Sequence, residues 1–181
     1  MPDASHPTRT LLLDTGLGLA ERASLGGFPI DEVVRVAGVA KGTFYVHFPS
    51  RTAYLAALHE RFHDRLRDAI GRAADGLPPG ADHLRAGVTA YLDGCLTARG
   101  VKAMLASARG EPAIAARVAM SNRRFAAEAE PDFAALGAAR PAERAVLFVA
   151  MAAEIALLEL DRGGPASELR NELWVLAGIT A

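Results

Sequence analysis

Apolar side chains recur along this chain at intervals of three and four residues, the spacing that gathers them on one face of a helix. No stretch shows the strict alternation of a strand, so the pattern predicts an all-α protein. Glycine and proline mark the breaks, for example at Gly26-Gly27 and in the Gly-Leu-Pro-Pro-Gly run at 76–80. The expected helices span residues 7–23, two short segments on either side of Gly38, and then 50–74, 82–99, 101–109, 112–136, 141–162 and 166–179.

The segment from Ile30 to Arg51 has the plan of a helix-turn-helix. The first short helix presents Val33 and Val34 inward, and Gly38 suits the turn because glycine tolerates a positive φ. In the second helix, Phe44 and Phe48 lie four residues apart and share one buried face. Such a second helix lies in the DNA major groove, where the side chains at its start reach base edges. Those positions are Lys41, Gly42 and Thr43.

Residues 30–51 closely resemble the DNA-binding segment of the TetR family of transcriptional regulators. Ala37-Gly38-Val39, Gly42-Thr43-Phe44-Tyr45 and His47-Phe48 follow the family pattern in register, and Arg51 stands where lysine is usual. The resemblance implies an N-terminal helix-turn-helix DNA-binding domain at 1–50 and a C-terminal effector-binding and dimerisation domain at 51–181. It also implies a repressor that a small-molecule effector releases from double-stranded operator DNA. We expect Lys41 and Thr43 to contact bases, and Tyr45, His47 and Arg51 to contact phosphates.

The helices at 141–162 and 166–179 predict a homodimer. The first is apolar on nearly every side, and a helix of that kind is buried all round. In TetR proteins the last two helices form a four-helix interface across a twofold axis, which also supplies two half-sites for DNA. Leu173 is expected in that interface, whereas Trp174 fits either the interface or the protomer core. A hydrophobic effector is expected among the helices from 50 to 136, with these candidate lining residues: Phe62, Tyr91, Met104, Met120 and Phe125.

Composition supports a helical protein with a full core. The 181 residues are 51% hydrophobic, Cys95 is the only cysteine, and no apolar run is long enough to span a membrane. The polar first ten residues do not resemble a signal peptide, so a cytoplasmic location is expected. Charge is less typical of a DNA-binding protein, because residues 1–75 hold nine Lys/Arg and nine Asp/Glu. No cofactor is expected.

A second motif favours a different chemistry. His59-Glu60-Arg61-Phe62-His63 matches the His-Glu-x-x-His zinc signature, in which two histidines one helical turn apart bind zinc and the glutamate acts as a general base. A zinc-dependent hydrolase or a metal-binding protein is therefore an alternative. The pattern is short, however, and its helix already belongs to the TetR-like architecture. The TetR resemblance rests on more matched positions, so we favour the interpretation that follows from it. In that interpretation His59 and His63 form a partly solvated pair, and the protein is not an enzyme.

Some positions depart from the TetR pattern. Phe28-Pro29 stands where a threonine or serine usually caps the first helix of the motif, and Ala40 replaces the usual serine cap of the second. Asp31 would repel phosphate if it faced DNA. A degenerate family member with weak DNA binding is thus a further alternative.

Overall fold

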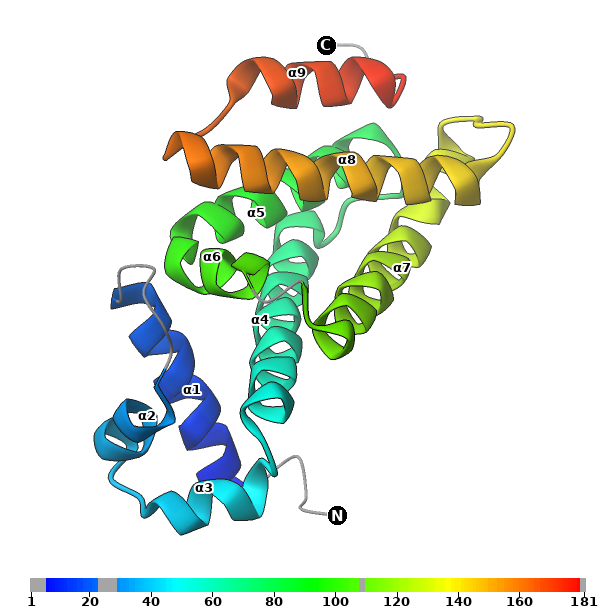
Figure 1. The fold of residues 1–181 in the computed structure, drawn as a ribbon. Coiled ribbons are helices and arrows are strands. Elements are labelled where there is room, and N and C mark those ends of the chain that lie inside the picture. The colour runs from blue at the N-terminus through cyan, green and yellow to red at the C-terminus, as the bar shows by residue number, and fades with distance from the viewer. Residues whose placement is uncertain (1–5, 23–28, 108–109, 180–181) are drawn as a thin grey trace. The chain divides into compact units, whose positions relative to one another are not determined.

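The computed structural model describes residues 6–22, 29–107 and 110–179, and in these ranges the chain is helical without strands. The helices are α1 (Pro7–Arg22), α2 (Ile30–Ala37), α3 (Lys41–His47), α4 (Arg51–Ala74), α5 (Ala81–Thr97), α6 (Arg99–Ser107), α7 (Pro112–Ala135), α8 (Pro141–Arg162) and α9 (Ser167–Leu176) (Figure 1). The all-α prediction is confirmed, and each expected helix is present. The loop expected at Gly26-Gly27 lies outside the described residues.

One predicted break differs from the structure. Gly100 was expected to end a helix, but it is the second residue of α6. A Cβ at Gly100 would lie 1.9 Å from the carbonyl oxygen of Ala20, so this glycine is required by a close approach of α1 and α6 rather than by a turn. Pro131 lies inside α7, and the helix continues to Ala135. A proline so close to the end of a helix removes one amide donor but leaves few turns to disrupt.

The chain divides into two compact units. The first comprises residues 1–63 and 98–117, and the second comprises 64–97 and 118–181. Each unit is thus built from two segments that are distant in sequence, because the units are defined by contacts within the fold. The predicted boundary at residue 50 instead separates a DNA-binding from an effector-binding part of the chain, and it stays a prediction.

The core of the first unit is an aromatic cluster beneath α3. Phe44, Phe48 and Tyr54 are almost completely buried, with ring centroids 4.8–5.4 Å apart. The Tyr54 hydroxyl donates a hydrogen bond to the Leu12 carbonyl oxygen at 2.7 Å, which ties α4 to α1. Burial of this hydroxyl raises the pKa of Tyr54 well above its usual range. The buried faces of α2 and α3 were predicted, whereas Tyr54 was missed because the pattern of α4 is dominated by its aliphatic stripe.

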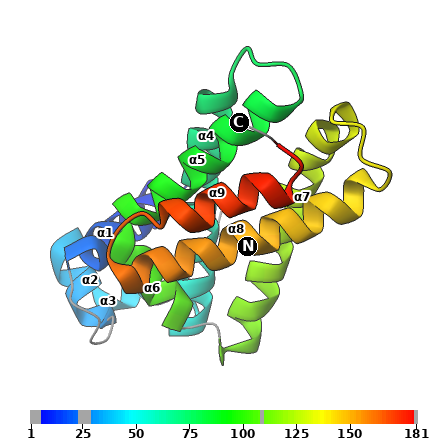
Figure 2. The ribbon, with the colours of Figure 1, turned by 90° about the horizontal axis from the view of Figure 1, so that it is seen from above.

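The second unit contains an antiparallel pair formed by α8 and α9, which lie side by side in both views (Figures 1 and 2). Gly163 ends α8 with a positive φ of 82°. Glu159 of α8 is fully buried and accepts hydrogen bonds from the Ala166 amide and from Arg170 Nε and Nη2 at 2.6–2.9 Å. These bonds fix the turn between the helices and the start of α9.

Leu173 and Trp174 lie inside the protomer rather than on its surface. Leu173 is 1% exposed, and the Trp174 ring lies 6.2 Å from that of Phe148 and beneath the Arg85 guanidinium. The sequence had placed Leu173 in the dimer interface, and this is wrong because that face of α9 packs on its own protomer. The part of the chain that the structure describes contains no helix long and apolar enough to cross a membrane.

Candidate functional site

The helix-turn-helix has the predicted geometry in the first unit. Gly38 caps α2 in the left-handed conformation with φ 68°, and the Val39 amide then donates to the Val34 carbonyl. This turn redirects the chain into α3, which Phe44 anchors on the core. Neither helix has a side-chain hydrogen bond from its N-cap residue, Pro29 or Ala40. The motif is therefore held by its buried face and its turn, not by capping.

The outer face of α3 carries side chains that the core does not use. Lys41 and Gly42 are exposed, Thr43 is half-buried, and Tyr45 is 45% exposed. Val46 is 68% exposed, the highest value of any large apolar residue described, and no contact within the protein explains an apolar side chain there. Sequence reasoning did not single out Val46. The spacing of exposed positions along the helix could have identified it.

The two basic side chains of this region both face carboxylates. Lys41 Nζ lies 2.6 Å from Asp31 Oδ1, and this hydrogen bond raises the pKa of Lys41. Asp31 therefore lies beside the start of α3. Arg51 Nη1 lies 3.7 Å from Glu111 Oε1, and Glu111 also accepts a hydrogen bond from the Thr52 hydroxyl at 2.8 Å. Acidic partners thus offset part of the positive charge on this surface.

His47, at the end of α3, lies in a crowded and positively charged setting. Its ring is half-buried, 4.7 Å from that of His6. Burial, together with the charges of His6 and Arg9, lowers the pKa of His47. The imidazole is therefore biased toward its neutral form, in which one ring nitrogen is a hydrogen-bond donor and the other an acceptor.

The histidine pair of the zinc-like motif is buried rather than partly solvated. His59 and His63 are 2% and 8% exposed, and their rings stack with centroids 4.2 Å apart. Glu60 points to the surface, where its carboxylate lies 3.4 Å from Arg117 Nη1. In residues 6–22, 29–107 and 110–179, no three His, Cys, Asp or Glu side chains are placed to hold a metal ion. Within these ranges, the arrangement that the zinc alternative would require is not formed.

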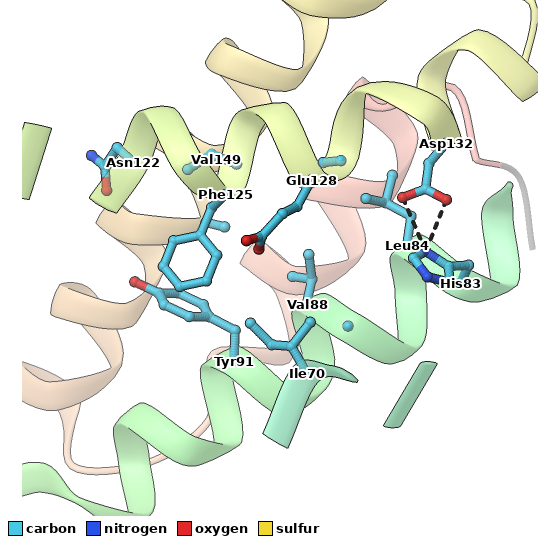
Figure 3. Close-up of a pocket in the computed structure, with 13 residues that line it drawn as sticks. Ile70, His83, Leu84, Val88, Tyr91, Asn122, Phe125, Glu128, Asp132 and Val149 are labelled. Carbon is cyan, nitrogen blue, oxygen red and sulfur yellow. Dashed lines mark hydrogen bonds and ion pairs between the residues drawn. The ribbon is translucent and has the colours of Figure 1, made fainter. Parts of the chain in front are cut away.

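A pocket lies within the second unit, between α5, α7 and α8 and the end of α4 (Figure 3). Counted out to its open mouth, it contains about 590 Å³ of space, which suits a small molecule. Tyr91 and Phe125 line it, as the sequence suggested, with their ring centroids 5.9 Å apart in an edge-to-face arrangement. Ile70 and Val88 add apolar surface to the lining, and its polar side chains include Asn122, Glu128 and the His83–Asp132 pair.

The remaining candidate ligand residues lie elsewhere. Phe62 is buried in α4 and Met104 is half-buried in α6, both in the first unit. Met120 is 46% exposed on α7. None of the three lines this pocket, and nothing in the structure tests whether any of the five residues binds a ligand. Sequence reasoning missed Asn122 and Glu128, which lie on the helical face of α7 that also carries Phe125.

The first unit therefore contains a helix-turn-helix, and the second unit contains a largely apolar pocket. The sequence profile described as "Bacterial regulatory proteins, tetR family" matches residues 12–58, which cover α1 to the first turns of α4. Residues 12–58 are thus similar to the N-terminal DNA-binding domain of the TetR family. None of these comparisons favours the zinc-hydrolase alternative.

Individual relatives agree with this assignment. The chain is 36% identical over 69 residues to the HTH-type transcriptional repressor NemR of Escherichia coli K12, and the alignment spans about a third of the relative (35%) and 36% of this chain. The crystal structure of reduced E. coli NemR has a TM-score of 0.74 at 19% identity, covering 97% of this chain and 98% of that one. A transcriptional regulator from Rhodococcus sp. Rha1 has a TM-score of 0.73 at 19% identity, covering 94% of both chains. These structural likenesses extend the shared fold to the second unit.

Proposed function

We propose that this protein is a transcriptional regulator that binds double-stranded operator DNA through α3 and acts in the cytoplasm. The observation that carries the proposal is the exposed face of α3 beyond a buried Phe44 and Phe48. Lys41 and Thr43 would contact base edges, and Val46 would contact a thymine methyl group, which is the apolar feature of the major groove. Tyr45, His47 and Arg51 would contact phosphates, which position the helix without reading sequence.

A homodimer would supply the second recognition helix. Helices α8 and α9 expose six large apolar side chains, each of them 38–66% accessible: Val146, Leu147, Leu158, Leu169, Val175 and Leu176. Apolar groups gathered on one pair of helices are typical of an interface. Pairing two such faces across a twofold axis gives a four-helix contact on the order of 2,000 Å² in total, as obligate dimers need. The name of NemR as a repressor supports repression as the outcome of operator binding.

The pocket of the second unit is proposed as the effector site. Its apolar walls and few polar groups are the usual make-up of a small-molecule site. An effector that binds more tightly to a dimer with unsuitably spaced recognition helices would shift the population to that form and release DNA. A second candidate function is a weakly DNA-binding family member. The uncapped α2 and α3 and the Asp31–Lys41 ion pair favour it.

The test is binding of the purified protein to its own upstream region and to a library of genomic fragments at low salt. We expect one or a few fragments to be retained specifically. Val46→Ala should weaken that binding by about tenfold, since a lost base contact costs roughly 1–3 kcal/mol of discrimination. Val36→Ala is the matched control, because Val36 is an exposed valine of α2 outside the proposed reading face. Retention of no specific fragment at any concentration would favour the weakly binding alternative.

A further inference from the structure

The charged groups that line the pocket of the second unit are mainly acidic. Of its thirteen lining residues, Glu128, Asp132 and His83 can ionise, and none is lysine or arginine. Asp132 is buried and accepts hydrogen bonds from the Gly80 amide at 2.9 Å and from His83 Nδ1 at 2.9–3.1 Å. It therefore serves to hold the loop before α5 and the His83 ring. This leaves Glu128 as the pocket carboxylate with capacity for a ligand.

Glu128 lies at the open side of the pocket, where its side chain is 51% exposed, and its carboxylate is turned toward the aromatic pair. Figure 3 shows its carboxylate beside the rings of Phe125 and Tyr91, with Val88 on the neighbouring wall. The nearest basic group is Arg67, whose Nε lies 4.0 Å from Glu128 Oε1, beyond hydrogen-bonding distance. Arg67 is held instead by a short contact with Asp64, one turn earlier on α4. Glu128 is thus only loosely compensated by the protein.

The electrostatics of Glu128 point in the same direction. Burial raises its pKa, and the charges of Arg67 and Arg124 oppose that rise without cancelling it. A carboxylate in such a place gains from a cation that approaches through the pocket. The edge-to-face rings of Tyr91 and Phe125 offer a second attraction, because the π-face of an aromatic ring is negative and stabilises a nearby positive charge.

We propose that this pocket binds a small aromatic molecule that carries one positive charge, with its cationic group between the Glu128 carboxylate and the rings of Tyr91 and Phe125. The inference rests on the proposed function only in taking this ligand as the effector. The apolar wall of Ile70, Leu84 and Val88 accommodates the uncharged part of the molecule. A polar tip on the ligand would reach the Asn122 amide at the other end of the pocket.

Other charge types fit the lining less well. An anion would lie beside Glu128 and near Asp132 with no lysine or arginine on the wall, and like charges at close range repel strongly in a partly dry site. A neutral aromatic compound would fill the apolar volume but would remove water from the Glu128 carboxylate without replacing it. That desolvation carries a penalty which a cation avoids.

The experiment compares two molecules of nearly the same shape. Benzyltrimethylammonium carries a positive charge, and neopentylbenzene replaces its nitrogen with carbon and is neutral. Binding of each to the full-length protein in the absence of DNA is measured by ligand-observed NMR and by thermal shift. We expect the cation to bind on the order of tenfold more tightly than its neutral isostere, the size of effect that one partly desolvated charge contact produces. Benzylsulfonate, the anionic counterpart, should bind least.

Two matched substitutions locate the contact. Glu128→Gln keeps the shape of the side chain but removes its charge, so the preference for the cation should be lost. Binding of the cation should weaken, whereas binding of the neutral compound should stay the same or tighten, because it no longer desolvates a carboxylate. Glu130→Gln, at an exposed position of the same helix outside the pocket, should preserve the preference. Phe125→Leu should weaken binding of the cation more than binding of the neutral compound, because leucine lacks the π-face but keeps the pocket wall apolar.

Several results would overturn the inference. These are equal affinity for the two isosteres, a cation preference that survives Glu128→Gln, or no binding of any of the three compounds. None of these measurements involves DNA, so they separate the pocket from the proposed regulator. If the protein selects the cation through Glu128 but retains no DNA fragment, the ligand class is supported and the proposed function is rejected. If it retains a specific DNA fragment but shows no preference for the cation, the proposed function is supported and the ligand class is rejected.

Discussion

Gly16 of α1 leaves the space that the Tyr54 hydroxyl occupies. A Cβ built on Gly16 would lie 2.1 Å from Tyr54 Oη and 3.1 Å from Leu58 Cδ2, which is too close for either contact. The same hydroxyl donates to the Leu12 carbonyl, one turn earlier on α1. Glycine at position 16 is therefore required by the close packing of α1 on α4.

This relationship predicts a non-additive pair of substitutions. Gly16→Ala should destabilise the protein by about 1–3 kcal/mol through overpacking, although alanine is the better helix former. Tyr54→Phe should cost about 1 kcal/mol by removing the hydrogen bond. Because phenylalanine lacks the clashing oxygen, the double variant should be more stable than the sum of the two losses predicts. Urea unfolding of the four proteins completes the cycle.

A glycine on an open helix surface provides the control. A Cβ added to Gly71 of α4 would meet no neighbouring side chain or helix within 4 Å. Gly71→Ala should therefore stabilise the protein by roughly 0.5–1 kcal/mol. Equal effects of alanine at both glycines would contradict the packing explanation for Gly16.

The Asp31–Lys41 ion pair predicts a change in DNA binding that does not depend on base sequence. Asp31→Asn would release the Lys41 ammonium and remove a negative charge close to the DNA. Affinity for non-specific DNA should rise, and the slope of log K against log salt should steepen by about 1 unit for one added phosphate contact. Fluorescence anisotropy across a salt series measures both.

The neighbouring Glu32 supplies the matched comparison for Asp31. It pairs with Arg35 on the exposed side of the same helix, with the Arg35 Nε to Glu32 Oε2 distance at 2.8 Å. Glu32→Gln also removes one negative charge but leaves Lys41 paired, so the salt slope should change less than in Asp31→Asn. If the two variants behave alike, net charge rather than the freed lysine is responsible.

The buried Glu159–Arg170 pair predicts acid sensitivity. Burial alone would raise the pKa of Glu159, but the hydrogen bonds from Arg170 and the Ala166 amide outweigh it, and the pKa is lowered. The unfolded chain therefore binds a proton more readily than the folded one. The stability from this group is fully present above the ordinary carboxyl pKa and is lost as pH falls through the lowered value. Denaturant unfolding between pH 3 and pH 7, roughly the range in which carboxyls titrate, follows this loss.

Substitution separates this pair from surface ion pairs. Arg170→Met should cost about 3–5 kcal/mol, because it leaves the Glu159 carboxylate buried without its cation. The variant should also lose part of its acid sensitivity, since Glu159 would then no longer have a lowered pKa. Arg162→Met removes an exposed partner of Glu168 and should change stability by less than about 1 kcal/mol. Similar losses for both arginines would count against the special role of Glu159.

The proposed dimer predicts that a charge on the outer face of α8 separates the protomers. Leu147 is 66% exposed, so Leu147→Glu should leave the protomer folded while placing a carboxylate in the interface. Light scattering should show a dimer for the wild type and a protomer near 19 kDa for the variant, with operator binding lost. Leu77→Glu, at an exposed position in the loop before α5, should remain dimeric. A monomeric wild-type protein would refute the dimer.

The sequence predicted the helices well because most of them carry an apolar stripe and several end next to glycine or proline. It also placed Phe44 and Phe48 in the core and gave the turn at Gly38. Contacts between helices far apart in the chain were not predictable in this way. Leu173 has the same apolar character whether it faces its own protomer or a partner, and only the packing of α9 on α8 decides between them.

The candidate sites also divide into features that a local pattern predicts and features that depend on long-range packing. Lys41, Thr43 and Tyr45 could be named from the local motif, because the face of a short helix follows from its spacing. Tyr91 and Phe125 were named as large side chains in the right region, but Glu128 was not. Its importance depends on α7 lying opposite α5, a long-range arrangement that no local pattern encodes.

The contact of Gly100 with Ala20 limits how the DNA-binding part can be separated from the rest. At this point α6 touches the backbone of α1, so α1 is covered by a helix encoded some eighty residues later. A fragment that stops at residue 63 would expose that side of α1 to water. The chain is consequently a poor donor of a portable DNA-binding module: a chimera would have to carry residues 98–117 along with the first 63. Position 100 tolerates only glycine for the same reason, because even the methyl group of alanine would force α1 and α6 apart.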